Sequence, residues 1–179
     1  LNKDNKGILA FQYYPLKNKN RMEFPKRQEY KYTKADLLNF FGFLKNKKII
    51  ESNQFWAGSF FMKKNSFTTS FLENWLNIFE KNYELVDDSP SKITNHKDFI
   101  ENRHDQSIFS LLCKKNKISS LSAYECEWCL KHGKRYWGYL TKSPVIAKRD
   151  LSYNLLRRFI NRQKRTYSRY KKKFLINFF

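Results

Sequence analysis

The apolar residues of this chain fall into short runs separated by longer periodic stripes. The run at residues 7–14 is apolar through its middle and predicts a strand that is covered on both faces. A second run at residues 55–62, Phe-Trp-Ala-Gly-Ser-Phe-Phe-Met, predicts a strand with Gly58 near its centre. Residues 118–123 predict a third, short strand. Strands that alternate with helices in this way favour an α/β fold.

Three helices are predicted from apolar stripes with spacings of three and four residues. The first opens at residues 33–36, where Thr33 can cap the helix and Asp36 favours the positive end of its dipole. The second begins at residue 65 and the third at residue 104. The residues expected on their buried faces are Leu37, Leu38, Phe40, Phe41 and Leu44 in the first, Phe67, Phe71, Leu72, Trp75, Leu76, Ile78 and Phe79 in the second, and Ile108, Phe109, Leu111 and Leu112 in the third.

The remaining segments are expected to be irregular or to lie apart from this domain. Residues 15–32 and 84–98 are polar and predict loops, and residues 124–147 are aromatic without a clear period. Residues 150–179 predict a basic, amphipathic C-terminal helix attached to a domain that spans residues 1–149. Three short strands are too few for a complete doubly wound sheet, so part of the sheet is expected upstream.

Composition supports one folded domain with a basic tail. Of the 179 residues, 18% are aromatic, which is enough to build a core, because each buried ring removes about 150–250 Å² from water. The net charge is +20, and half of it lies in residues 148–179, where eleven Lys and Arg residues accompany a single Asp. Such a tail suits an anionic lipid surface, nucleic acid or a phosphorylated substrate.

The sequence has few features of a secreted or membrane-spanning protein. Its three cysteines are an odd number, which fits a reducing compartment better than a disulfide scaffold. No apolar run reaches the roughly 18–20 residues that span a bilayer, and no signal peptide is recognisable. We therefore expect a cytoplasmic protein. Because the first residue is Leu rather than Met, the natural N-terminus is expected to lie further upstream.

Four blocks of residues, taken in order, resemble a known family. The most specific block is residues 101–112, Glu-Asn-Arg-His-Asp-Gln-Ser-Ile-Phe-Ser-Leu-Leu, which is similar to the RHDQS block of bacterial GT-A-type glycosyltransferases from capsule and lipopolysaccharide loci. Residues 32–37 (Tyr-Thr-Lys-Ala-Asp-Leu), 54–58 (Gln-Phe-Trp-Ala-Gly) and 85–91 (Leu-Val-Asp-Asp-Ser-Pro-Ser) resemble its other blocks. The resemblance implies a partial GT-A fold, a mixed sheet with flanking helices that forms the acceptor-side part of the catalytic domain.

The resemblance implies transfer of a hexose, with galactose as the first expectation, from a nucleotide sugar to a cell-surface glycan or lipid-linked acceptor. Asp105 is the expected base or sugar-hydroxyl acceptor, Gln106 would bind donor or acceptor hydroxyls, and Arg103 would offset pyrophosphate charge. His104 would face the diphosphate or a divalent cation, Mn²⁺ or Mg²⁺. The main ligands of that cation are expected upstream, because the family holds it with an acidic element and no Asp-x-Asp motif occurs here.

Five further residues are candidates for binding substrate. Gln54, Ala57 and Gly58 lie where the GT-A fold brings a strand close to the donor sugar, and small residues permit a close approach. Asp87 and Asp88 are candidates for binding acceptor hydroxyls. A β-bulge or tight packing under the helix that carries Trp75 is the alternative interpretation of the first group, and a solvated turn is the alternative for the second.

Structural alternatives also remain open for the RHDQS block and for the cysteines. Asp105 can simply cap a helix, and Arg103 can pair with Glu101 on the surface. The pattern Cys-x2-Cys-x2-His at residues 126–132 could bind zinc with Cys113 as the fourth ligand. Ordinary buried thiols are favoured, because the gap before the histidine is shorter than in zinc fingers.

Two other classes of function compete with glycosyl transfer. The charge and the interleaved aromatic rings would serve phosphate contacts and base stacking in a nucleic-acid-binding protein, although no recognised nucleic-acid motif occurs. An inactive, truncated glycosyltransferase is the other alternative. In the preferred interpretation no nucleic acid is bound, and residues 157–173 hold the protein on the inner face of the cytoplasmic membrane. A solvated helix is the alternative for this segment.

Overall fold

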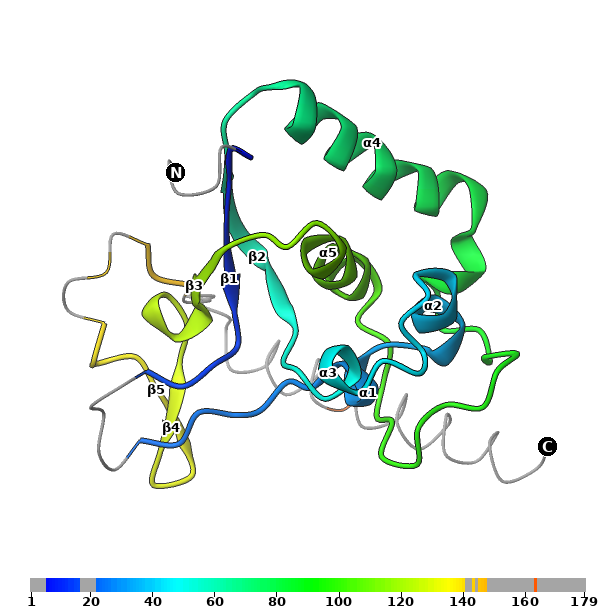
Figure 1. The fold of residues 1–179 in the computed structure, drawn as a ribbon. Coiled ribbons are helices and arrows are strands. Elements are labelled where there is room, and N and C mark those ends of the chain that lie inside the picture. Colours follow the sequence, from blue (N-terminus) through cyan, green and yellow to red (C-terminus); the bar gives the residue numbers. More distant parts are fainter. Residues whose placement is uncertain (1–5, 17–21, 141–142, 144, 148–162, 164–179) are drawn as a thin grey trace. The chain divides into compact units, whose positions relative to one another are not determined.

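The computed structural model describes residues 6–16, 22–140, 143, 145–147 and 163. The chain divides into two compact units, Leu1–Lys148 and Arg149–Phe179, and the fold below is that of the first. This unit is mixed α/β, with a small mixed sheet flanked by helices (Figure 1). The predicted basic helix after residue 150 falls outside the described residues, apart from Gln163, and stays a prediction.

Three strands form the sheet, in the order β2-β1-β3. Strand β1 (Ile8–Gln12) pairs antiparallel with β2 (Phe55–Met62) and parallel with β3 (Ser120–Ser122), so the three predicted strands are confirmed. The carboxyl ends of the parallel strands β1 and β3 lie at the same edge of the sheet. In open α/β sheets this is the edge where ligands bind.

A register shift of the β-bulge type interrupts the pairing of β1 with β2. Leu9 lies opposite Phe61, whereas Phe11 lies opposite Trp56, so β2 has extra residues between the two pairs. A Cβ at Gly58 would lie 2.4 Å from Nε1 of Trp56, so the glycine leaves the space that the indole ring occupies. The bulge considered for this strand is therefore present, and Gly58 packs against Trp56 of its own strand.

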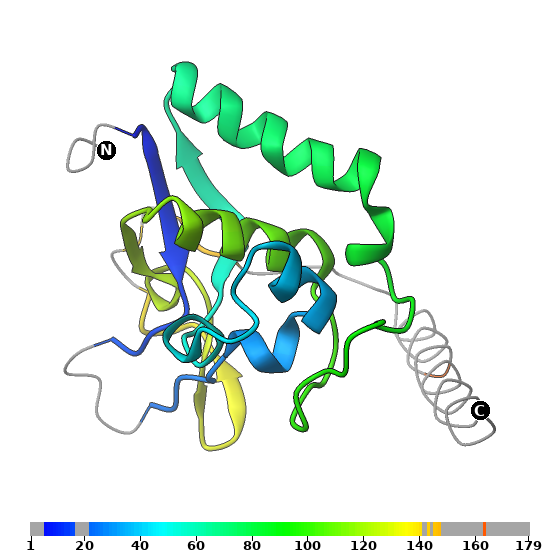
Figure 2. The same cartoon turned by 45° about the vertical axis from the view of Figure 1, so that its right-hand side comes forward.

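The three predicted helices are present, and two of them pack in layers beside the sheet. Helix α5 packs on β2, and α4 packs on α5 (Figures 1 and 2). Asn65 caps α4 through a capping box with Thr68, in which each side chain accepts a backbone N–H. The bounds of the predicted helices are α2 (Ala35–Phe40), α4 (Ser66–Lys81) and α5 (His104–Lys115).

Several short elements lie in segments expected to be irregular. Strands β4 and β5 form a hairpin, whose two-residue turn consists of His132 and Gly133, both with positive φ. The prediction that residues 15–32 and 124–147 are irregular throughout is therefore wrong. The additional elements are α1 (Glu29–Tyr32), α3 (Lys47–Ile50), the 3-10 turns η1 (Tyr83–Leu85) and η2 (Ala123–Glu125), β4 (Cys129–Lys131) and β5 (Lys134–Tyr136).

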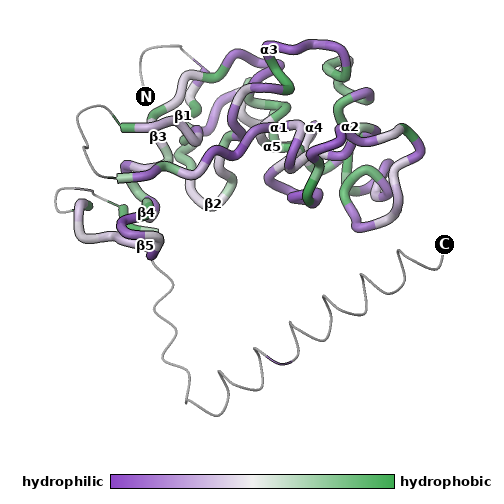
Figure 3. The backbone as a smooth tube through the Cα atoms, turned by 90° about the horizontal axis from the view of Figure 1, so that it is seen from below, coloured by the Kyte–Doolittle hydropathy of each residue, from purple (hydrophilic) through white to green (hydrophobic). Residues whose placement is uncertain are grey.

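Two apolar clusters cover the two faces of β1, as its apolar sequence predicts. Ile8 and Ala10 belong to the larger cluster, which is centred on α5. Phe11 and Tyr13 belong to a smaller cluster with Trp56 on the other face. Figure 3 shows hydrophobic and hydrophilic residues interleaved along the helices, as expected for elements that bury one side.

Three predicted core residues and one predicted cap were wrong. Phe40 is 51% exposed, Leu72 is 45% exposed and Leu76 is 56% exposed, because the buried stripes of α2 and α4 are narrower than their sequences suggest. The N-cap of α2 is Lys34, which makes no side-chain cap hydrogen bond, and the Thr33 hydroxyl donates to Glu29 instead. The Thr33 side chain therefore binds the buried Glu29 carboxylate and does not cap α2.

Candidate functional site

A fully buried carboxylate, that of Glu29, is the hub of a polar network between α1, β2 and α5. Its Oε2 accepts hydrogen bonds from Thr33 Oγ1 at 2.6 Å and from Gln54 Nε2 at 3.2 Å. Its Oε1 accepts from the Ser110 hydroxyl and from Lys114 Nζ, the latter at 2.6 Å. Burial lowers the pKa of Lys114, and the Glu29 carboxylate opposes that shift. The charge is thus paired and hydrogen-bonded, as burial requires.

Gln54 joins this network to the start of α5. Its Oε1 accepts a hydrogen bond from Gln106 Nε2 at 2.9 Å, and its Nε2 donates to Tyr32 O at 3.2 Å. The Ser107 hydroxyl donates to the same carbonyl at 2.7 Å. The first turn of α5 is therefore hydrogen-bonded to Gln54, the residue that the resemblance places near the donor sugar.

Lys34 and Asn102 hold the loop that carries the predicted acidic pair. Lys34 is buried, and its Nζ donates to Glu84 O at 2.6 Å and lies 3.6 Å from Asp87 Oδ1. Asn102 Nδ2 donates to Val86 O at 3.0 Å. Hydrogen bonds from Ser89 lower the pKa of Asp87 below its ordinary value. The acidic pair is therefore fixed beside the N-terminus of α5.

The first residues of α5 face outward and adopt an unusual backbone. Arg103 is the N-cap and makes no side-chain cap hydrogen bond, and His104 has a φ of 46°. A positive φ costs a non-glycine residue on the order of 1 kcal/mol, so the surrounding contacts must hold it in place. Asp105 lies in the first turn and is exposed, and it is not the helix cap.

His104 is oriented by two contacts from the acidic loop. Its Nδ1 lies 2.7 Å from Val86 O, and its Nε2 lies 3.7 Å from Asp88 Oδ1. Since a carbonyl only accepts, Nδ1 carries the proton in the neutral ring, and Nε2 then presents a lone pair. The ring can accept a proton at Nε2 and would then pair with Asp88.

Arg103 is held at the same place by an aromatic ring and an acid. Its guanidinium lies 4.2 Å from the ring centroid of Tyr32, and its Nε lies 3.6 Å from Glu101 Oε1. The surface ion pair considered for this residue is therefore present. Contact with the flat face of the guanidinium leaves its N–H edge available to an anion.

Six of the nine predicted site residues meet around the start of α5. They are Gln54, Asp87, Asp88, Arg103, His104 and Gln106, and Asp105 lies in the same turn. Ala57 and Gly58 lie in the irregular part of β2, where Gly58 accommodates Trp56.

Four residues of the buried network were not predicted: Glu29, Ser107, Ser110 and Lys114. A signal for them exists in the sequence. Ser107, Ser110 and Lys114 follow one another at helical spacings of three and four on the side of α5 that also carries Leu111. Polar side chains on a buried face require buried partners, so this spacing predicts a buried acid from elsewhere in the chain.

The cysteines do not assemble into a metal site in the part of the chain that the structure describes. Cys113 lies in the α5 cluster, Cys126 lies in the smaller cluster, and both are buried free thiols, as is Cys129. His132 lies in the exposed turn between β4 and β5. Within the described residues, no group of three or more His, Cys, Asp or Glu side chains could hold a metal ion.

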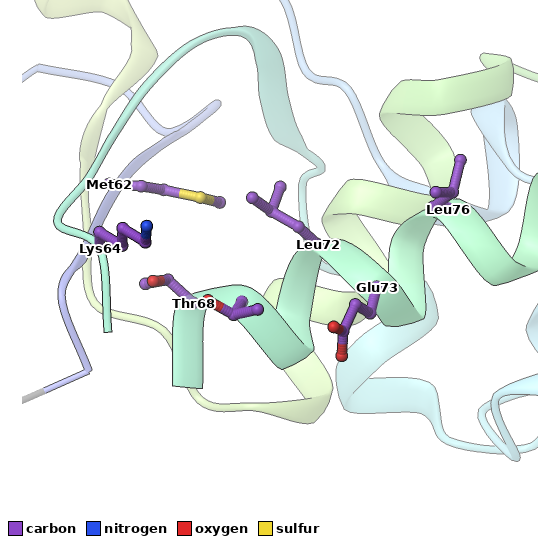
Figure 4. Close-up of a pocket in the computed structure, with 7 residues that line it drawn as sticks. Met62, Lys64, Thr68, Leu72, Glu73 and Leu76 are labelled. Atoms are coloured by element: carbon purple, nitrogen blue, oxygen red, sulfur yellow. The ribbon is translucent and has the colours of Figure 1, made fainter. Parts of the chain in front are cut away.

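A groove of about 460 Å³ lies away from this group, along the outer side of α4 (Figure 4). Met62 from β2 and Leu72 from α4 point toward each other across it, and Lys64 and Glu73 are its charged residues. A second groove of about 310 Å³ lies between α2, α4 and α5, with Phe40 and Asn77 among its lining residues. Neither contains a predicted site residue.

No helix among the described residues is long and apolar enough to cross a membrane. Comparison of the chain with protein-family models, curated proteins and solved structures gave no match. Support for a function therefore comes from the chemistry of the site and from the resemblance of its four sequence blocks.

Proposed function

We propose that this chain belongs to a glycosyltransferase of the GT-A type, which transfers a hexose from a nucleotide sugar to a glycan or lipid-linked acceptor. The single observation that supports it most is that the four resembling blocks contact one another. Tyr32 accepts hydrogen bonds from Gln54 and Ser107, and Lys34 contacts Asp87. His104 contacts Asp88. Segments up to 75 residues apart thus converge on the outward-facing first turn of α5.

The chemistry of this turn suits transfer to a hydroxyl group. An exposed carboxylate at Asp105 can accept the proton of an attacking hydroxyl or bind a sugar hydroxyl. Gln106 is held by its Nε2 bond to Gln54, so its Oε1 has a fixed direction from which it can accept a sugar hydroxyl. Arg103 offers a guanidinium edge to developing phosphate charge. His104 can take up a proton at Nε2.

The divalent cation implied by the resemblance does not fit the described residues by themselves. His104 and Asp88 supply two possible ligands, whereas a Mn²⁺ or Mg²⁺ site needs more. We therefore derive no step that depends on a cation, and the proposed roles concern protons and hydrogen bonds alone.

The test is a transfer assay on the full-length product of the gene that encodes this chain. A panel of UDP- and GDP-sugars is offered with and without Mn²⁺, and donor hydrolysis and acceptor transfer are measured. Asp105→Asn should lower turnover about 10²–10⁴-fold, the usual contribution of a positioned acid or base. Asp98→Asn, another exposed acid, should leave turnover within about twofold.

Two outcomes would count against this function. Near-normal turnover of Asp105→Asn, with unchanged circular dichroism, would remove Asp105 from the reaction. Failure of the wild-type protein to hydrolyse or transfer any sugar on the panel, while folded, would overturn glycosyl transfer itself.

A further inference from the structure

Three arginines from separate segments gather at the edge of the sheet where β1 and β3 end. Arg27 precedes α1, Arg103 precedes α5, and Arg135 lies in β5. All three lower the pKa of one half-buried carboxyl, that of Glu127, although burial raises that pKa overall. The charges of all three arginines therefore act on the same carboxyl.

Aromatic rings lie beside these guanidinium groups. Arg27 lies 5.8 Å from the ring centroid of Trp128 and 5.7 Å from that of Tyr32. Arg135 lies 4.6 Å from Trp128, and Arg103 lies 4.2 Å from Tyr32. A ring attracts the charge of a guanidinium without accepting a conventional hydrogen bond, so an oxyanion can still bind the N–H donors.

The N–H donors of the Arg27 guanidinium have few hydrogen-bond acceptors among the described residues. A guanidinium has five N–H groups, and Nη1 of Arg27 donates to the Tyr32 hydroxyl at a long 3.4 Å. Its Nε is buried and has no hydrogen-bond partner among the described residues. In that same part of the chain, the one carboxylate within 4.0 Å of any of the three guanidiniums is Glu101, beside Arg103. Buried donors are normally satisfied, so a missing partner is indicated.

We propose that Arg27, Arg103 and Arg135 form an oxyanion-binding site, which accepts a phosphate or carboxylate group. Planar guanidinium groups match these oxyanions by paired, charge-assisted hydrogen bonds. Three arginines close to two carboxyls, Glu101 and Glu127, leave an excess of positive charge for an incoming anion. The site lies at the carboxyl ends of parallel strands, where α/β sheets bind ligands. Anion binding by this cluster does not depend on glycosyl transfer, and it can be measured without it.

The experiment is a binding titration of the complete 179-residue chain, at constant ionic strength, with inorganic pyrophosphate, inorganic phosphate and glucuronate as probes. Binding is followed by calorimetry and by the indole ¹H–¹⁵N NMR signal of Trp128, which Trp128→Phe assigns. Because the basic tail also attracts anions, the indole signal shows whether the anion reaches this site. Tighter binding of the phosphates or of glucuronate identifies which oxyanion the site prefers.

Two pairs of neighbouring residues give matched charge changes. Arg135→Gln should weaken binding at least tenfold, whereas Lys134→Gln, an exposed cation one residue away, should change it less than twofold. Arg27→Lys keeps the charge but loses the planar fork and should also weaken binding at least tenfold, whereas Lys26→Arg, which also keeps the charge, should change it less than twofold. Arg135 is exposed, so its substitution leaves the fold intact.

Either of two results would overturn the site. Equal weakening by Arg135→Gln and Lys134→Gln would show that binding follows total charge. Binding of all three probes without movement of the Trp128 indole signal would place the anion elsewhere on the chain. If the wild-type protein binds these anions but transfers no sugar, the anion site is supported and only the proposed function is contradicted.

Discussion

The buried carboxylate of Glu29 is expected to stabilise the folded protein around the site. Glu29→Gln would leave the Lys114 ammonium without its anion, at a side chain only 6% exposed. Removing one partner of a buried ion pair typically costs 3–5 kcal/mol, so we expect a loss of about that size in the free energy of unfolding, measured by urea denaturation. Glu80→Gln, at an exposed position of α4, should change it by less than about 0.5 kcal/mol.

The double substitution Glu29→Gln with Lys114→Met checks the cause. If the unpaired ammonium is responsible, removing it should restore part of the lost stability. A double variant as unstable as the sum of the two single variants would show that packing, and not charge, explains the loss.

Glu127 gives the protein a pH dependence with a definite sign. Burial raises its pKa above the ordinary 4.5, and the neighbouring arginines only partly oppose that shift. Between 4.5 and the raised pKa the folded state holds more protons than the unfolded chain, so this group's contribution to stability falls as the pH rises through that window. Glu127→Gln cannot titrate, so its stability relative to wild type should grow as the pH rises from about 4 to 7.

Thermal unfolding at several pH values, at fixed ionic strength, measures this difference. A stability difference that stays constant, or that shrinks with rising pH, would contradict a raised pKa for Glu127.

At the scale of elements, the register shift in β2 depends on Gly58. Gly58→Ala would place a Cβ 2.4 Å from the Trp56 indole nitrogen, so the ring or the strand must move. Overpacking of this kind costs typically 1–3 kcal/mol, and we expect a loss of stability in that range together with a change in tryptophan fluorescence. In a Trp56→Leu background the same substitution should cost less than about 0.5 kcal/mol, because the clashing ring is absent.

Apolar periodicity and capping residues predicted the long helices and strands, because each of these elements contains several helical turns or several strand residue pairs. The stripe Phe67, Phe71, Ile78 repeats over four turns, and Asn65 marks its start. Helices α1 and α3 have four residues each, too few for any period to appear. The β4–β5 hairpin has a usable turn signal, His132-Gly133, but the prediction considered His132 only as a zinc ligand in the less favoured alternative.

The sequence grouped residues 103–106 because they are adjacent in the chain, and the order of the resembling blocks added Gln54, Asp87 and Asp88, which lie close to them in the structure. Glu29, which accepts hydrogen bonds from Ser110 and Lys114 further along α5, lies 81 and 85 residues before them in a segment that gives no local sign of burial, and it became a hub through tertiary contacts. Arg27 and Arg135 escaped notice for the same reason, since the sequence does not show that their segments meet.

At the scale of the whole molecule, the basic segment after residue 148 should determine where the protein is found. Residues 157–173 carry a dense set of Lys and Arg, and each such residue near an anionic leaflet contributes about 1 kcal/mol of binding. We predict that the chain cosediments with vesicles containing phosphatidylserine, and that it does so weakly with vesicles of phosphatidylcholine alone. Raising the salt concentration should reduce that binding, because the attraction is electrostatic.

Deletion of residues 149–179 separates this effect from the folded unit. The boundary matches the division between Leu1–Lys148 and Arg149–Phe179, so the remaining chain keeps its own set of contacts. The truncated protein should lose vesicle binding at least tenfold while retaining the Trp128 response to pyrophosphate. Undiminished vesicle binding would assign the lipid contact to the folded unit, whereas strong retention of single-stranded nucleic acid by the full chain, with no preference for anionic vesicles, would favour a nucleic-acid-binding tail.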